Sequence, residues 1–124
     1  MNFKLPAFIT CSSLLLLGCG GNDSRLSLVK NGAFDFCPQA TVKEMVDSYI
    51  ANPSWEAFVA TDGNDYVNVE GQIYYYEALV DMLLQFRVND DMDRFEVNAF
   101  EIEGESQYEF MTNALLENMC DEAS

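Results

Sequence analysis

Four cysteines supply the most reactive side chains of this 124-residue chain, which contains no histidine. Cys11 and Cys19 stand near the amino terminus, whereas most of the remaining sequence separates Cys37 from Cys120. None of these spacings is the Cys-x-x-Cys of thiol redox sites, and the absence of histidine excludes the common Cys-His and Ser-His-Asp catalytic arrangements. The thiols therefore point to covalent attachment or to a disulfide.

Cys19 directly follows a short apolar segment. The residues from Leu5 to Leu17 are mostly apolar, Lys4 is the only charge before them, and Gly18 is the small residue before the cysteine. A helix needs about 20 apolar residues to cross a bilayer, so this run is too short and is typical of a removable export signal. The alternative is a standard signal cut nearby, which would leave Cys19 as a free thiol.

The order Leu16-Leu17-Gly18-Cys19 resembles the lipobox of bacterial lipoproteins. The resemblance implies removal of residues 1–18, attachment of diacylglycerol to the Cys19 sulfur, and acylation of the new amino terminus. Two or three acyl chains hold a protein stably on a membrane, whereas one holds it only marginally. Because Gly20 stands where Asp would mark inner-membrane retention, the resemblance implies a lipid anchor on the periplasmic side, with the outer membrane favoured.

The charge balance restricts the class of partner. The chain has 21 acidic and 6 basic residues, a net charge of −15, and cleavage before Cys19 removes Lys4 but no acid. Such a charge repels nucleic-acid phosphates and anionic lipid surfaces, so we expect no nucleic-acid partner. A cationic partner remains an alternative to a merely solvated acidic surface.

Cys37 and Cys120 form the remaining pair of thiols once the signal is removed and Cys19 is acylated. Two leftover cysteines in an oxidising compartment predict a disulfide, which would join the start of the domain to its end. The alternative is a pair of separate buried thiols.

The elements that position these residues begin after a tether. Residues 19–27 are small and polar and predict a flexible linker to a single domain over residues 28–124, with an additional short strand at Leu26–Lys30. Thr41 and Glu44 form a capping box at the start of a helix whose apolar residues recur at helical spacing. Asn52-Pro53 is expected to stop this helix.

Beyond this helix the apolar residues alternate, which predicts strands. A second capping box at Ser106 and Glu109 predicts a helix that ends at Cys120, with Tyr108, Met111, Leu115 and Met119 facing inward. We therefore expect an α+β fold, a four-stranded antiparallel meander with two helices packed on one face. The strands are expected at residues 55–59, 66–75, 80–88 and 95–102, with turns at Asp62-Gly63, Glu77-Ala78 and Asn89–Asp93 and a bulge or a strong twist near Ala99.

Six short segments are spread over most of residues 28–118: "LVKNG", "TVKEMVDSY", "NPSWEAF", "TDG", "LLQFRVNDD" and "FEVNAFEI". Together they resemble a family of small bacterial envelope proteins whose domain is tethered by a lipid or a membrane helix. The resemblance implies this fold and an envelope location. It implies no catalytic residue, because the matched motifs are mostly turns and core positions.

Carboxylates are the remaining candidates for chemistry. A glycosidase pair needs one carboxyl desolvated in a cleft, but acids such as Glu96 and Glu101 alternate with core residues, as on a solvated strand face. The acidic turn Asn89–Asp93 lacks the glycine and the distal glutamate of an EF-hand loop. We therefore predict no catalytic residue, no metal site and no cofactor.

Tyrosines mark the predicted partner-binding face. By alternation Tyr74 and Tyr76 point outward, with Tyr66 and Leu83 on the same side of the sheet. Tyrosine contributes large contact area at low entropic cost in protein interfaces. The alternative is an ordinary sheet surface paired across strands.

Three functions follow from these observations. The first is a non-enzymatic lipoprotein whose tyrosine-bearing face binds another envelope protein. The second is an acidic inhibitor or immunity protein against a basic toxin or hydrolase. The third is a small hydrolase that works through paired carboxylates.

Overall fold

The computed structural model describes residues 23–124. The signal segment and Cys19, to which the lipidation prediction refers, lie outside these residues. The elements are α1 (Ser24–Asn31), α2 (Val42–Tyr49), β1 (Ala51–Val59), β2 (Asp65–Tyr75), β3 (Ala78–Val88), β4 (Phe95–Ile102), β5 (Glu105–Ser106) and α3 (Glu109–Ala123).

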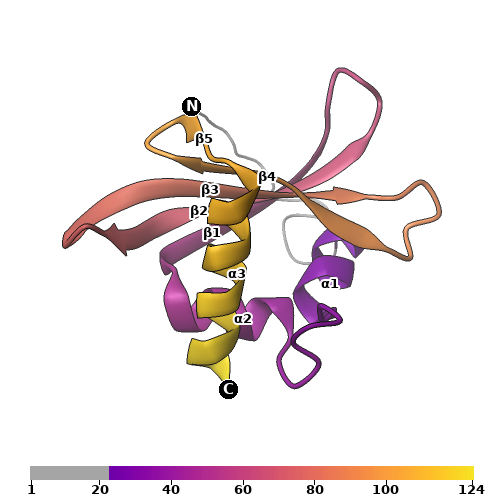
Figure 1. Ribbon diagram of the computed structural model, residues 1–124. Coiled ribbons are helices and arrows are strands. Elements are labelled where there is room, and N and C mark those ends of the chain that lie inside the picture. Colours follow the sequence, from indigo (N-terminus) through magenta and orange to yellow (C-terminus); the bar gives the residue numbers. More distant parts are fainter. Residues whose placement is uncertain (1–22) are drawn as a thin grey trace, which may run out of the picture.

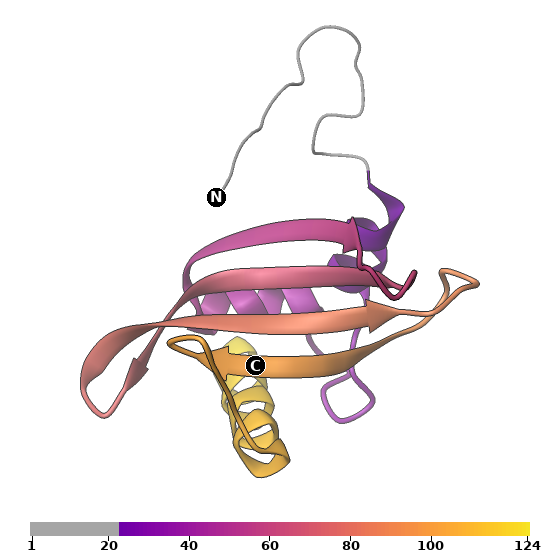
Figure 2. The same cartoon turned by 90° about the horizontal axis from the view of Figure 1, so that it is seen from above.

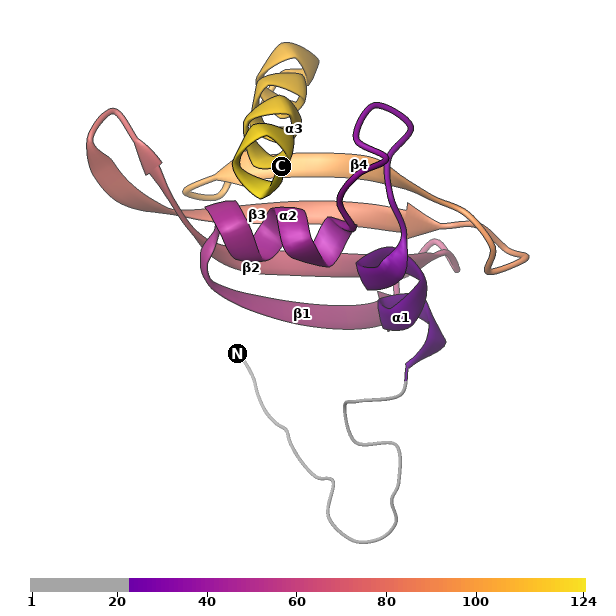
Figure 3. The ribbon, with the colours of Figure 1, turned by 90° about the horizontal axis from the view of Figure 1, so that it is seen from below.

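The strands form one antiparallel sheet in the order β1-β2-β3-β4-β5, so each strand pairs with its neighbour in sequence. The three helices of the described residues lie on one face of the sheet (Figure 1, Figure 3). The other face, seen from above in Figure 2, is open. The predicted α+β fold with an antiparallel sheet is confirmed, although the small strand β5 and the helix α1 were not expected.

The core lies between the sheet and the helices. Phe86 and Leu84 of β3 are fully buried against Met45 of α2 and Met119 of α3. Each side chain of this size stabilises the fold by roughly 1.5–3 kcal/mol when it is removed from water. The alternation of β2 and β3 thus separates a buried apolar face from an open, more polar one.

The helix α2 begins as predicted and ends earlier than predicted. The Thr41 hydroxyl accepts from the Glu44 amide at 3.1 Å, and the Glu44 carboxylate accepts from the Thr41 amide at 2.8 Å, which confirms the capping box. Asn52-Pro53 does not end the helix; it lies in β1, where the register to β2 shifts and Asn52 has φ 53°. A Cβ on Gly71 would lie 2.5 Å from the Ile50 side chain, so glycine is needed for this close contact.

The prediction of a strand at Leu26–Lys30 is wrong, because these residues form the helix α1. Asp23 caps the helix by accepting from the Arg25 amide at 2.8 Å. Residues 24–27, expected in the flexible tether, are helical as well. Local capping and the burial of Val29 against the core favour the helix here.

The predicted bulge in β4 is confirmed. Gln85 pairs with Ala99 and Phe86 with Val97, so Asn98 is the extra residue. Its amide donates to Gln85 at 2.6 Å, and Gln85 donates to Asn68 at 3.0 Å, which forms an amide ladder across three strands of the open face.

The predicted capping box of the last helix is wrong. Ser106 lies in β5, where it pairs with Glu101, and α3 begins only at Glu109. Tyr108 occupies the N-cap position without a side-chain capping bond, and its ring is exposed rather than turned inward. Gln107 instead closes the segment by donating its backbone amide to the Phe100 carbonyl at 2.8 Å.

The predicted disulfide between Cys37 and Cys120 is present in the structure, and it joins residues 83 apart in sequence. A loop of this length stabilises a domain by about 4.5 kcal/mol in the chain-entropy account. Beside it the Gln39 amide donates to the Ser124 hydroxyl at 2.7 Å. Among residues 23–124, no helix has the length and apolar character required to span a membrane.

Candidate partner-binding site

The structure does not bring the four predicted face residues together. Tyr66 pairs with Arg87 near one end of β2, and Leu83 lies mid-sheet between Glu70 and Glu101. Tyr74 and Tyr76 belong to the opposite end of β2 and to the turn beyond it. The predicted single face therefore divides into three separate environments.

Tyr66 is not available to a partner. Its ring stacks on Phe58 of β1 with centroids 5.8 Å apart, and only 8% of the residue is exposed. Its hydroxyl donates to the Asp62 carboxylate at 2.8 Å. Tyr66 is on the open side of the sheet as predicted, but cross-strand packing makes it a structural residue.

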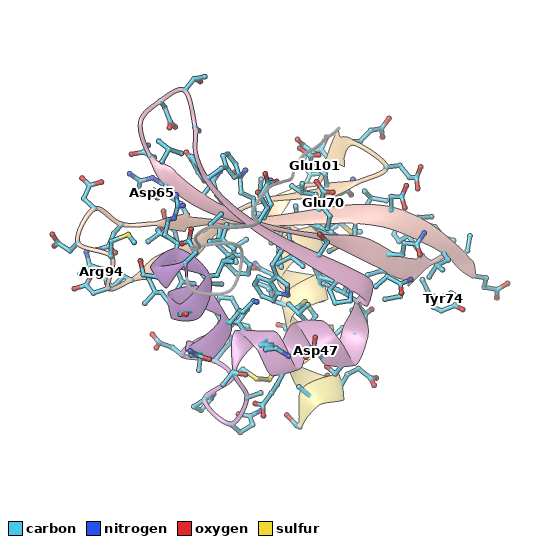
Figure 4. All side chains as sticks on the ribbon, turned by 180° about the vertical axis from the view of Figure 1, so that it is seen from behind. Asp47, Asp65, Glu70, Tyr74, Arg94 and Glu101 are labelled. Atoms are coloured by element: carbon cyan, nitrogen blue, oxygen red, sulfur yellow. A yellow bond between two sulfur atoms is a disulfide. The ribbon has the colours of Figure 1, made fainter. Side chains whose placement is uncertain are left out.

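Leu83 is half-buried on the floor of a shallow groove across the open face. Three carboxylates line this groove of about 480 Å³: Glu70, Asp81 and Glu101. Figure 4 shows Glu70 and Glu101 on the same side of the sheet, away from the helices. Leu83 is therefore an apolar side chain surrounded by acidic ones, and it does not belong to a surface formed by the tyrosines.

The tip of the β2–β3 hairpin carries the most exposed tyrosines. Tyr74 is 76% and Tyr76 is 87% exposed, and the Tyr76 ring lies 4.6 Å from that of Tyr75. The turn consists of Tyr76 and Glu77, which have φ angles of 51° and 67°. Positive φ at both positions suits a two-residue hairpin, but such turns normally use Asn-Gly, so the Tyr-Glu turn is strained.

A groove of about 220 Å³ lies between this tip and α3; we call it the tyrosine groove. Its walls are formed by the tyrosines of β2 and its turn and by one side of α3. The lining residues include Tyr74, Tyr75, Tyr76, Met111, Ala114 and Asn118. Ala114 and Asn118 are exposed and lie outside the inward stripe predicted for this helix, so their contribution to the groove was not predicted.

A second pair of exposed aromatic rings lies at the start of α3. The rings of Tyr108 and Phe110 stack with centroids 6.0 Å apart, and they are 77% and 67% exposed. Phe110 directly precedes Met111 of the tyrosine groove. Clustered exposed aromatics are more typical of a contact surface than of an ordinary solvated helix end.

The opposite end of β2 fixes the first described residues of the chain. The Arg25 guanidinium binds Asp23 at 2.7 Å and Asp65, the first residue of β2, at 2.8 Å. Asp65 and Tyr74 are at opposite ends of the sheet in Figure 4. We call these two ion pairs of Arg25 the clamp. Since β2 has 11 residues, the hairpin tip lies about 33 Å from the clamp.

Two carboxyl groups have lowered pKa values, and the cause in each case is hydrogen bonds that stabilise the fold. Hydrogen bonds from the Arg25 side chain lower the pKa of Asp23 below its ordinary value of 3.8. The pKa of Asp62 is also lowered, because the Asn64 amide and the Tyr66 hydroxyl donate to its carboxylate. A general acid requires a shift in the other direction, so neither group is suited to that role.

Within residues 23–124 no group of three or more His, Cys, Asp or Glu side chains is placed to hold a metal ion. Comparisons of the chain with protein-family models, curated proteins and solved structures yield no match. The candidate site is therefore defined by its geometry alone.

Proposed function

We propose that this protein is a non-enzymatic binding module, lipid-anchored through Cys19 on the periplasmic side of a bacterial outer membrane. The observation that carries the proposal is the hairpin tip, where Tyr74 at the end of β2 and Tyr76 in the strained turn both expose most of their surface. Two exposed aromatic residues at one hairpin tip are costly for a monomer in water. They are favoured in a protein that buries them in a partner.

The position of the tip supports the same proposal. A chain anchored at Cys19 joins the domain next to Asp23, which Arg25 holds to Asp65 at the far end of β2. Only a few residues separate Cys19 from this clamp, so the domain stays near the bilayer. The hairpin tip, about 33 Å along β2 from the clamp, is then free to reach a neighbouring envelope protein.

Site-specific photo-crosslinking in the producing cell tests the proposed contact. A benzoylphenylalanine at position 76 should form a discrete crosslinked species with one envelope protein, whereas the same group at position 56 should not. Glu56 is the matched control, because it is exposed on β1 and far from the hairpin turn. Equal crosslinking from both positions, or none from position 76, would contradict the proposal.

The anchor has its own test. Replacement Cys19→Ala should abolish metabolic labelling with palmitate and release the domain from the membrane fraction. The matched variant Cys11→Ala should be labelled like the parent, because the lipobox resemblance places position 11 within the removed segment. Undiminished labelling of Cys19→Ala would refute acylation at this residue.

A further inference from the structure

The tyrosine groove has an apolar floor and lies next to acidic side chains of α3. Tyr74, Met111 and Ala114 give it apolar walls, and Ala114 is exposed on the helix surface. At helical spacing the same side of α3 continues from Ala114 to Asn118 and Asp121, and Glu117 stands beside this row, three residues after Ala114 and four before Asp121. A segment that lies in the groove and follows α3 therefore meets apolar side chains first and carboxylates next.

The charge along α3 is entirely negative. The helix carries four acids, Glu109, Glu117, Asp121 and Glu122, and no lysine or arginine. Ion pairs within residues 23–124 use Arg25 and Lys43 with Asp23, Asp65 and Asp47, so none involves an acid of α3. Glu77 adds a further carboxylate in the hairpin turn, next in sequence to Tyr76 of the other wall.

The last turn of α3 contains acidic residues, which are unfavourable at the carboxyl end of a helix. Asp121 and Glu122 stand in the last turn, where the helix dipole already places partial negative charge, and no basic residue stands there. Acids at this position destabilise the isolated helix. A cation from a partner would be attracted both by the carboxylates and by the helix end.

We propose that the tyrosine groove receives a lysine- or arginine-rich amphipathic helix of a partner protein. Its apolar side chains contact Tyr74, Met111 and Ala114, and its cations lie against Glu117 and Asp121. This inference rests on the proposed function, since it names the chemistry of the partner that the hairpin tip contacts. Helix-in-groove binding of this type uses apolar anchors for affinity and charges for orientation and association rate.

The same charges disfavour two other occupants. A second copy of this chain would bring a second row of α3 carboxylates against the first. An anionic lipid surface would be repelled by a protein whose full-length net charge is −15. The groove is thus better matched to a cationic protein segment than to either of these.

A fluorescent 14-residue helical peptide of leucine and lysine, with its leucines on one face, provides the probe. We expect the purified domain to bind it, and the double variant Glu117→Gln with Asp121→Asn to weaken binding about tenfold. The control Glu56→Gln with Glu96→Gln removes the same charge from exposed strand positions and should change binding less than about twofold. A peptide of the same composition without an apolar face should bind much more weakly.

Equal weakening by the groove variant and the control would overturn the inference, because it would show attraction to overall charge only. So would binding to vesicles of phosphatidylethanolamine and phosphatidylglycerol, or self-association through the groove in sedimentation velocity. Circular dichroism checks the fold of each variant. Asn118→Lys, which places a cation on an exposed lining residue, is a second variant that should also weaken binding.

The two proposals fail separately. If position 76 crosslinks to a partner and peptide binding does not depend on Glu117 and Asp121, the cationic-helix inference is wrong, but the proposal of a binding module is retained. If the peptide depends on these acids and no partner crosslinks in the cell, the envelope-binding function is wrong.

Discussion

Strand β2 connects two hairpins whose chemistry differs. At its first end, Arg25 binds Asp65 at 2.8 Å, and Asp62 accepts from Tyr66 at 2.8 Å and from the Asn64 amide at 2.9 Å. At its other end, the side chains of Tyr74 to Glu77 take part in no hydrogen bond recorded within residues 23–124, and Tyr74 and Tyr76 are exposed. Polar side chains at the first end stabilise the fold, whereas aromatic side chains at the second are exposed to solvent.

The two hairpin turns differ in the same way. The β1–β2 turn has its positive φ of 86° at Gly63, which tolerates this conformation, and a Cβ there would meet nothing within 4 Å. The β2–β3 turn has positive φ at Tyr76 and Glu77, which do not tolerate it well. The backbone is therefore relaxed in the turn at one end of β2 and strained in the turn at the other, and strain of this kind is more common at functional sites than elsewhere.

The sharpest test exchanges a tyrosine for alanine at each end of β2. Tyr66→Ala should lower the free energy of unfolding by about 3 kcal/mol, because it removes a buried ring and its bond to Asp62. Tyr74→Ala should change it by less than about 0.5 kcal/mol. Urea denaturation followed by tryptophan fluorescence measures both; similar losses would remove the distinction between the two ends.

A second test repairs the strained turn. Replacing Tyr76 by Asn together with Glu77 by Gly should raise the free energy of unfolding by about 1–2 kcal/mol, because these residues adopt positive φ readily. The same variant should lose partner binding, since it removes an exposed ring. A variant that is no more stable than the parent would show that the turn carries no strain.

A third test introduces strain at the opposite turn. Gly63→Ala should cost about 1 kcal/mol through its backbone angle alone, because the added methyl group meets no neighbouring atom. Binding through the distant hairpin tip should be unchanged. Thermal unfolding measures the cost, and a loss of binding in this variant would indicate that the two ends of β2 are coupled.

The smallest expected effect is the pH dependence at the bonded end. Because its lowered pKa shows that the Asp62 anion is favoured in the fold, its contribution is full above pH 3.8 and is lost as the pH falls through the folded-state pKa. Asp62→Asn should therefore be less stable than the parent at pH 7, with a gap that closes on acidification. Asp90→Asn in the β3–β4 turn is the control, and an identical pH profile for both variants would contradict the assignment.

Most of the sheet could be predicted from the sequence, because strand alternation and turn residues are local signals. The bulge near Ala99 was predictable, because the apolar residues change from one face of the strand to the other at this point. The capping box was predictable, because both of its hydrogen bonds join Thr41 to Glu44, three residues away in sequence. The helix α1 was not predictable in this way. Leu26 and Leu28 alternate like a strand, and the fold is decided by the Asp23 cap and by Arg25 reaching Asp65, 40 residues away.

The candidate site was predicted only in part, for a related reason. Alternation placed Tyr66 and Tyr74 on the same side of β2 but could not show that Phe58 covers only the first. It also could not show that α3 approaches the hairpin, because the wall formed by Met111 and Ala114 depends on tertiary packing. Exposure and grooves arise from contacts between elements, which local periodicity does not encode.

The irregular start of β1 has a consequence for crowding. β1 is an edge strand, and Asn52 breaks its register while Pro53 lacks the N–H group that a neighbouring strand would need. Copies of the domain held side by side on one surface would meet at high local concentration. The interrupted edge would then offer them no continuous row of backbone donors, which disfavours extension of one sheet from chain to chain.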